Sequence, residues 1–144
     1  MNIRKVQCLI YRYNPDLQIL LLHYSPPRSY WENLTGKVES GETDFECIRR
    51  EILEECSIDS GEIEDVVRIN SFQYSRDGSI IQENVYAVMI SAEAQVDISG
   101  NPEMEHDRYK WVKPAKAIDL LKWDQMRKAV EILMELKGEY ITSS

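Results

Sequence analysis

The sequence predicts an α/β fold in which a mixed β-sheet carries helices on both faces. Apolar segments with the alternation or branched residues typical of strands are interspersed with segments of helical periodicity. Two apolar segments flank the turn sequence Arg76-Asp77-Gly78-Ser79, which predicts a β-hairpin. The length of 144 residues fits one domain covering residues 1–144, with room for a sizeable core.

The predicted elements follow from these patterns and from local start and stop signals. Strands are expected at Lys5–Tyr11, Gln18–Tyr24, Trp31–Leu34, Val66–Tyr74, Ile80–Ile90 and Tyr109–Val112. Helices are expected at Thr43–Ser57, Pro114–Leu121 and Asp124–Lys137, with Pro114 suited to a first turn and Gly138 to a helix end. The segment Asp97–Arg108 is predicted to be a polar loop.

Composition excludes several functional classes. The formal net charge of -8 argues against broad, charge-driven binding of nucleic acid. A phosphorylated small molecule stays compatible, because bound divalent cations can invert the sign of the charge locally. No apolar run approaches the roughly 18–20 residues that span a bilayer, and the N-terminus lacks a signal-peptide pattern. Three cysteines without metal-ligand spacing fit reduced thiols, so we expect a cytoplasmic protein.

The predicted helix Thr43–Ser57 has a clear start and a clear apolar face. Thr43 and Glu46 form a capping-box pattern, in which each side chain binds the other residue's backbone N–H. The apolar stripe expected to dock on the sheet consists of Phe45, Ile48, Ile52 and Cys56.

The opposite side of this helix concentrates negative charge. Glu51, Glu54 and Glu55 crowd two turns, where like charges repel each other. Such crowding is easier to explain if hard cations lie among the carboxylates, since magnesium prefers oxygen ligands. Arg50 could orient and partly neutralise one glutamate. The preceding loop begins at Gly36, where glycine lets the backbone approach a ligand.

The spacing of these residues resembles the Nudix box. Gly36 is followed after five residues by Glu42, and after seven more by Arg50-Glu51-Ile52-Leu53-Glu54-Glu55-Cys56-Ser57-Ile58. One defining position departs from the pattern, because Ser57 stands where the box has glycine. Glycine eases a left-handed turn at a helix end, and serine there costs about 1 kcal/mol.

The resemblance implies a Nudix-type three-layer α/β/α sandwich that holds metal ions between loop and helix. It implies that Glu51, Glu54 and Glu55 are metal ligands, with an added oxygen from the carbonyl of Lys37 or of Gly36 beside it. Arg50 would orient Glu51, and Glu42 would be a structural or outer carboxylate. The implied cofactor is Mg²⁺, with Mn²⁺ able to substitute.

A second resemblance covers more of the chain. The run Tyr30–Thr43, the dipeptide Glu105-His106, the run Tyr109-Lys110-Trp111, and Trp123 are similar to bacterial dihydroneopterin triphosphate pyrophosphohydrolases, also called dATP pyrophosphohydrolases. This similarity implies that Glu105 completes the metal site. The mechanism also needs a general base for the attacking water, and Glu54 and Glu105 are the two candidates. His106 is read either as a packing histidine or as a phosphate contact. A basic residue of that subgroup is replaced here by His23-Tyr24-Ser25.

Several residues are candidates for substrate binding. Tyr30, Trp31, Tyr74 and Trp111 could stack on a base or a pterin, although core packing is the alternative for each. The place of Tyr74 after the box also resembles dinucleoside polyphosphate hydrolases, in which a tyrosine faces the nucleoside. Thr35 is expected to contact the substrate. Arg28 and Lys37 are expected either to bind phosphate or to be solvated surface charges.

The expected function is Mg²⁺-dependent hydrolysis of a phosphoanhydride bond in a nucleoside-diphosphate-linked substrate. The leading substrates are a (d)NTP or dihydroneopterin triphosphate, cleaved to a monophosphate and pyrophosphate. Glu54, Glu105 and Arg50 would serve the chemistry. The alternatives are a diadenosine polyphosphate hydrolase and a non-catalytic Nudix-fold module that binds nucleotides. The sequence leaves the oligomeric state open, with a homodimer as one option.

Overall fold

The computed structural model describes residues 2–101 and 103–138. The elements in chain order are β1 (Asn2–Tyr13), β2 (Leu17–Tyr24), β3 (Trp31–Glu32), β4 (Leu34–Lys37), α1 (Asp44–Cys56), the 3₁₀ helix η1 (Ser60–Glu62), β5 (Ile63–Arg76), β6 (Ser79–Ile90), β7 (His106–Val112), α2 (Pro114–Leu120) and α3 (Asp124–Leu136).

The described strands form a mixed sheet around β1, as predicted. The strand order is β3-β2-β1-β6-β5, while β4 pairs with β1 and β7 pairs with β2. The β1–β6 pair is parallel and runs from Asn2 opposite Ile80 to Tyr11 opposite Met89. The predicted hairpin is the antiparallel pair β5–β6, closed between Arg76 and Ser79.

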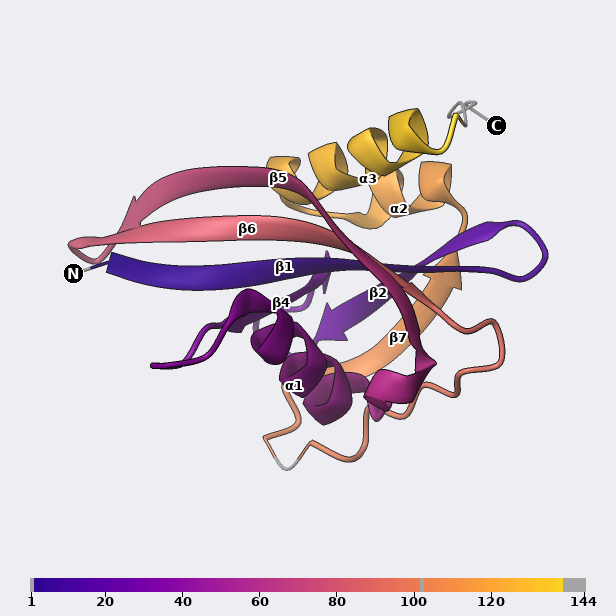
Figure 1. Cartoon of the computed structure of the whole chain (residues 1–144), viewed down its shortest axis with the longest axis horizontal. Helices are drawn as coiled ribbons and strands as arrows, with labels where there is room; N and C mark the ends of the chain where they lie inside the picture. The colour runs from indigo at the N-terminus through magenta and orange to yellow at the C-terminus, as the bar shows by residue number, and fades with distance from the viewer. Residues whose placement is uncertain (1, 102, 139–144) are drawn as a thin grey trace.

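Helices cover both faces of the sheet, which confirms the predicted three-layer sandwich. In Figure 1, α1 lies on one side of the sheet and α2 and α3 lie on the other. Alternate residues of β1 contribute to the two hydrophobic cores, one on each face of the sheet, because successive side chains of a strand point to opposite faces. Cys8 and Ile10 pack with Ile48 and Ile52 of α1. Leu9 and Tyr11 belong to the second core under α2 and α3.

The single strand expected at Trp31–Leu34 is two short strands in the structure. β3 pairs with β2, whereas β4 pairs with β1, so the chain changes partners at Asn33. Asn33 is fully buried, and its side-chain amide donates to Gln7 Oε1 at 2.9 Å. β7 begins at His106, earlier than predicted, because the β2 pairing continues to Tyr24 opposite His106.

Both predicted ends of the box helix are present in α1. Thr43 Oγ1 accepts from the Glu46 N–H at 3.1 Å, and Glu46 Oε1 accepts from the Thr43 N–H at 2.9 Å. Ser57 has φ 59° and ψ 28°, so serine adopts the left-handed conformation in which glycine is usual. Its hydroxyl donates to the Asp97 carbonyl at 2.8 Å and ties this end of the helix to the following loop.

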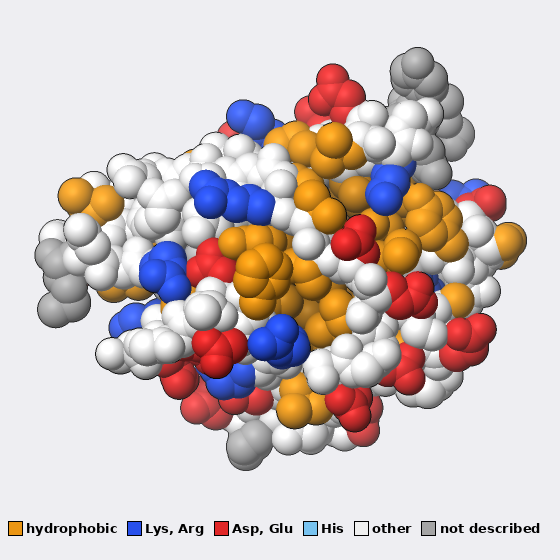
Figure 2. Space-filling model, in the orientation of Figure 1, with side chains coloured by type: hydrophobic (Ala, Val, Ile, Leu, Met, Phe, Trp, Pro, Cys, Tyr) orange, Lys and Arg blue, Asp and Glu red, His pale blue; other side chains and the backbone are white. Residues whose placement is uncertain are grey.

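One residue of the predicted apolar stripe was placed wrongly. Ile48, Ile52 and Cys56 are fully buried, but the Phe45 side chain is 48% exposed. Phe45 lies in the first turn, where its ring meets the ring of Tyr86 edge-on at 5.8 Å. Figure 2 shows that hydrophobic side chains gather in the middle of this face of the molecule, between α1 and α3.

Two further expectations concern the environment of the chain. The three cysteines are buried and free, as expected for reduced thiols. Among the described residues, no helix has the length and apolar character needed to cross a membrane.

Candidate active site

The three crowded glutamates of α1 lie in one cavity with the predicted loop glutamate. This carboxylate cavity has a volume of about 560 Å³ and includes Glu51, Glu54, Glu55 and Glu105 in its lining. Its other lining residues are Lys5, Tyr24, Thr35, Gly36, Lys37, Gly100, Asn101 and Glu103. The structure therefore brings together the carboxylates that the two resemblances selected, although Glu105 is far from the box in sequence.

Arg50 holds the loop and the helix of the box together. Its Nε and Nη2 donate to the two carboxylate oxygens of Glu42 at 2.8 and 2.9 Å. Nη1 donates to Glu51 Oε1 at 2.9 Å, and Nη2 also donates to the Lys37 carbonyl at 3.1 Å. Hydrogen bonds from Arg50 lower the pKa of Glu42 to about 2. Arg50 is thus placed to position Glu51, as the resemblance implies, and Glu42 serves as its anchor.

Glu51 is packed against the strand that precedes the box loop. A Cβ atom added to Gly36 would lie 2.3 Å from Glu51 Cγ and 2.4 Å from Cδ, so glycine makes this approach possible. Burial raises the pKa of Glu51 to about 7; Arg50 opposes the rise, and the charges of Glu54 and Glu55 add to it. A bound cation would lower the pKa of Glu51 again, because its positive charge favours the ionised carboxylate.

A buried histidine links Glu55 to a second carboxylate. His106 Nδ1 lies 3.0 Å from Glu55 Oε2, and His106 Nε2 lies 2.8 Å from Glu32 Oε2. All three side chains are less than a tenth exposed. Burial lowers the pKa of His106, but the hydrogen bonds to Glu32 and Glu55 outweigh it and raise that pKa to about 9. Both ring nitrogens therefore bind carboxylates, so of the two interpretations of His106 the structure favours the packed histidine over the phosphate contact.

The ligand atoms available for a cation are carboxylate oxygens. Atoms of Glu55, Glu105 and His106 lie within 4.8 Å of one another and could hold a metal ion. Since both nitrogens of His106 already bind carboxylates, the oxygens of Glu55 and Glu105 are the ligand atoms left for a cation, and each Glu55 oxygen is held by one hydrogen bond, from His106 or from Asn101. Burial, followed by the charge of Glu55, raises the pKa of Glu105. A set of oxygen donors fits a hard divalent cation.

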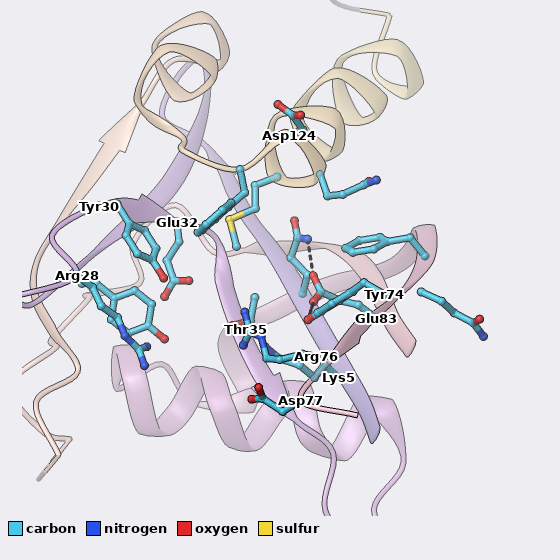
Figure 3. Close-up of a pocket in the computed structure, with 17 residues that line it drawn as sticks. Lys5, Arg28, Tyr30, Glu32, Thr35, Tyr74, Arg76, Asp77, Glu83 and Asp124 are labelled. Carbon is cyan, nitrogen blue, oxygen red and sulfur yellow. Dashed lines mark hydrogen bonds between the residues drawn. The ribbon is translucent and has the colours of Figure 1, made fainter. Parts of the chain in front are cut away.

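A second, larger cavity opens beside the carboxylate cavity. This aromatic cavity has a volume of about 920 Å³ and is lined by Tyr24, Tyr30, Phe72, Tyr74 and Trp123, with polar residues between them. Figure 3 shows Tyr30 and Glu32 on one side of it and Tyr74 and Glu83 on the other. Lys5, Tyr24 and Thr35 line both cavities, so the two adjoin each other.

The predicted substrate-binding residues divide between these cavities. Arg28 and Tyr74 line the aromatic cavity, Lys37 lines the carboxylate cavity, and Thr35 lines both. The other aromatic candidates divide between the aromatic cavity and the hydrophobic cores. Tyr30 lines the aromatic cavity, whereas Trp31 and Trp111 pack against the two cores, which was the alternative for each.

Lys5, Gln7, Glu32 and Glu83 line this site but were not singled out from the sequence. Lys5 and Gln7 belong to β1, and Lys5 is in register with Glu83 of β6. The available signal was Gln7 itself, a polar residue between Val6 and Cys8 in an apolar strand. It could not be interpreted without the strand pairing, because its partner Glu83 is distant in the sequence.

The comparison with protein families decides the assignment. The model of the NUDIX domain matches residues 3–133 of the chain. The chain belongs to the Nudix family. This membership confirms the family expected from the box, and with it the expectation of a pyrophosphohydrolase, a hydrolase that acts on acid anhydrides.

Individual relatives are distant in sequence. An octanoyltransferase from Myxococcus xanthus is 27% identical over 119 residues, covering 81% of this chain but 32% of that protein. The chain thus spans about a third of its length. A dihydroneopterin triphosphate diphosphatase from Escherichia coli is 28% identical over 141 residues, covering 89% of this chain and 91% of that protein. A C. elegans Ap4A hydrolase in a binary complex superposes with a TM-score of 0.80 at 21% identity, over 94% and 98% of the two chains.

Proposed function

We propose that this Nudix chain hydrolyses a phosphoanhydride bond of a (d)NTP or of dihydroneopterin triphosphate, releasing a monophosphate and pyrophosphate. One observation carries the proposal: a cavity lined by five glutamates adjoins, at Lys5 and Thr35, a cavity lined by aromatic rings. The first suits cation-bound phosphates and the second suits a flat heterocycle. A relative from E. coli, named a dihydroneopterin triphosphate diphosphatase and similar over 89% of this chain, supports dihydroneopterin triphosphate as the substrate.

We assign the cation ligands to the carboxylates of the first cavity. Glu51, Glu54, Glu55 and Glu105 would hold Mg²⁺, or Mn²⁺ in its place, through their oxygens. The Lys37 carbonyl, which accepts hydrogen bonds from Arg50 Nη2 and from the Cys47 thiol, would add one more oxygen. When bound, such cations would polarise the phosphoanhydride and lower the pKa of the attacking water.

The residues of the chain then have distinct tasks. Arg50 positions Glu51 through the 2.9 Å hydrogen bond to Oε1, while His106 and Asn101 each bind one oxygen of Glu55. Lys5 stands where the two cavities meet and would bind a phosphate oxygen. The Glu105 carboxylate would take the proton of the attacking water, because its raised pKa brings it closer to neutrality, where a general base works best. Glu54 is the alternative base.

A diadenosine polyphosphate is the second candidate substrate. Tyr74 lines the aromatic cavity and stacks on Phe72 with ring centroids 5.8 Å apart, which offers an aromatic surface to a nucleoside. A non-catalytic nucleotide-binding module is disfavoured, because a binder has no need of crowded carboxylates. A single domain over residues 1–144, a cytoplasmic location and assembly as a homodimer stay predictions from the sequence.

An assay that identifies the released products separates these functions. The full chain is incubated with nucleoside triphosphates, dihydroneopterin triphosphate and diadenosine tetraphosphate, with and without Mg²⁺. We expect pyrophosphate from a triphosphate only when metal is present. Preferential cleavage of diadenosine tetraphosphate would select the second candidate. Tight binding without turnover of any compound would select the module. Glu64, an exposed residue of β5, provides the matched control variant Glu64→Gln.

A further inference from the structure

Buried polar side chains form one wall of the aromatic cavity. Glu83 is 5% exposed and Gln7 is fully buried, yet both line the cavity. The Gln7 amide donates to Glu83 Oε2 at 2.9 Å, and the Tyr74 hydroxyl donates to Glu83 Oε1 at 3.1 Å (Figure 3). Within the described part of the chain, no Lys, Arg or His nitrogen forms an ion pair with Glu83. This carboxylate is therefore buried against neutral donors only.

The chemistry of Glu83 fixes the direction of the whole hydrogen-bond chain. A carboxylate only accepts, so Gln7 must present its NH₂ group to Glu83 and its carbonyl oxygen to Asn33. Asn33 Nδ2 donates to that oxygen at 2.9 Å. This leaves Asn33 Oδ1 buried without a hydrogen-bond partner, and Gln125 Oε1, from a residue lining the cavity, is buried in the same way. Glu83 and Gln125 thus place buried acceptor oxygens in the lining of the cavity.

Such a wall favours a ligand that brings donors. Each oxygen of Glu83 accepts one hydrogen bond and has a further lone pair free for a ligand. Buried acceptors that remain unpaired cost free energy, so a ligand that pairs them binds more tightly. The aromatic pairs Phe72–Tyr74 and Tyr30–Trp123 line the same cavity and suit a flat ring.

We propose that Glu83 determines specificity for a base with a 2-amino-4-oxopyrimidine edge, the edge that guanine and pterin share. This edge carries a ring N–H beside an exocyclic amine, and the two oxygens of Glu83 would accept one hydrogen bond from each. Adenine instead places its amine beside a ring nitrogen that accepts. The inference rests on the proposed function for the direction of the substrate: the base lies at Glu83, and the phosphates extend past Lys5 to the carboxylate cavity.

Binding of nucleoside monophosphates tests recognition of this edge separately from hydrolysis. Titration calorimetry with the full chain compares GMP with IMP, which lacks only the 2-amino group. We expect GMP to bind about tenfold more tightly or better, since a hydrogen bond to a charged acceptor is lost with IMP. Equal dissociation constants for GMP and IMP would overturn the proposal, whether or not the chain hydrolyses triphosphates.

The variant Glu83→Gln tests the residue. It replaces one acceptor by a donor, which no longer matches guanine and does match the edge of adenine. We expect the ratio of GMP to IMP affinity to fall to about one and AMP to gain relative to GMP, while Glu64→Gln keeps the wild-type ratio. An unchanged GMP preference in a Glu83→Gln protein of wild-type melting temperature would overturn the role of Glu83. If this variant does not fold, the wild-type comparison of GMP with IMP still decides the proposal.

Turnover distinguishes the two sources of the edge and separates this inference from the proposed function. The substrate with the higher kcat/KM, GTP or dihydroneopterin triphosphate, shows whether the site prefers guanine or pterin. Either preference supports recognition of the edge that the two rings share. Equal kcat/KM for GTP and ITP would overturn the inference and leave the hydrolase intact. Discrimination between GMP and IMP without hydrolysis of any triphosphate would support the inference and refute the proposed function.

Discussion

The buried pair of hydrogen bonds at His106 predicts a specific dependence of stability on pH. In the folded chain the pKa of His106 is raised to about 9 by Glu32 and Glu55, against burial, whereas an unfolded histidine has a pKa of about 6.5. A group whose folded pKa is raised stabilises the fold fully below its unfolded pKa. That stabilisation is lost as the pH rises through the folded pKa. For His106 the window runs from about 6.5 to about 9.

The size of the effect follows from the same two values. A difference in pKa between about 6.5 and about 9, at about 1.4 kcal/mol per pH unit, corresponds to about 3.5 kcal/mol of unfolding free energy. The side chain is 3% exposed, so solvent screens the interaction little. This is a large share of the about 5–15 kcal/mol by which domains are usually stable.

The measurement is urea unfolding of the wild type and of His106→Gln at several pH values between 6 and 10, with a chelator present. Other groups titrate in this range, so the quantity of interest is the difference in unfolding free energy between the two proteins. We expect this difference to be largest near pH 6 and to shrink by about 3.5 kcal/mol toward pH 10. A difference that stays constant across the range would refute the assignment of a charged His106 between Glu32 and Glu55.

Three further predictions concern the carboxylate cavity. Glu55→Gln should fold and lose turnover by orders of magnitude, because it removes an anionic ligand while keeping the shape; more than half of the wild-type rate at saturating Mg²⁺ would contradict this. Glu105→Gln should lower kcat with little change in melting temperature, whereas Glu64→Gln should leave kcat unchanged; equal rates for both would remove Glu105 from the site. Millimolar Mg²⁺ should raise the melting temperature at pH 8 more than at pH 5, because Glu51, with its pKa of about 7, is protonated at the lower pH and binds metal poorly. Melts that show no shift at either pH would count against a preformed metal site.

Local patterns were sufficient for much of the fold and for part of the candidate site. The capping box at Thr43 and the left-handed conformation at Ser57 depend on a few neighbouring residues, so the sequence predicted both helix ends. The crowding of Glu51, Glu54 and Glu55 is likewise local to one helix. Their placement in a shared cavity with Glu105 came from a resemblance, because no local rule connects a loop to a helix so far away in the chain.

The remaining features depend on pairing that no local pattern encodes. The division of the predicted strand at Asn33 follows from its burial beside Gln7, a residue of a different strand. Lys5 and Glu83 become neighbours only through the parallel register of β1 and β6. His106 was considered by itself, whereas its role depends on two carboxylates from β3 and α1. Long-range polar partners of this kind have no periodicity to reveal them.

The contact between Gly36 and Glu51 makes the two halves of the Nudix box mutually dependent. With 2.3 Å between an added Cβ at Gly36 and Glu51 Cγ, no larger residue fits at this strand position while the glutamate keeps its place. A protein designer who transplanted the helix onto another sheet would therefore also have to transplant the glycine. Conversely, a lineage that lost Glu51 would be freed from the need for glycine here, so substitutions at the two positions should be inherited together.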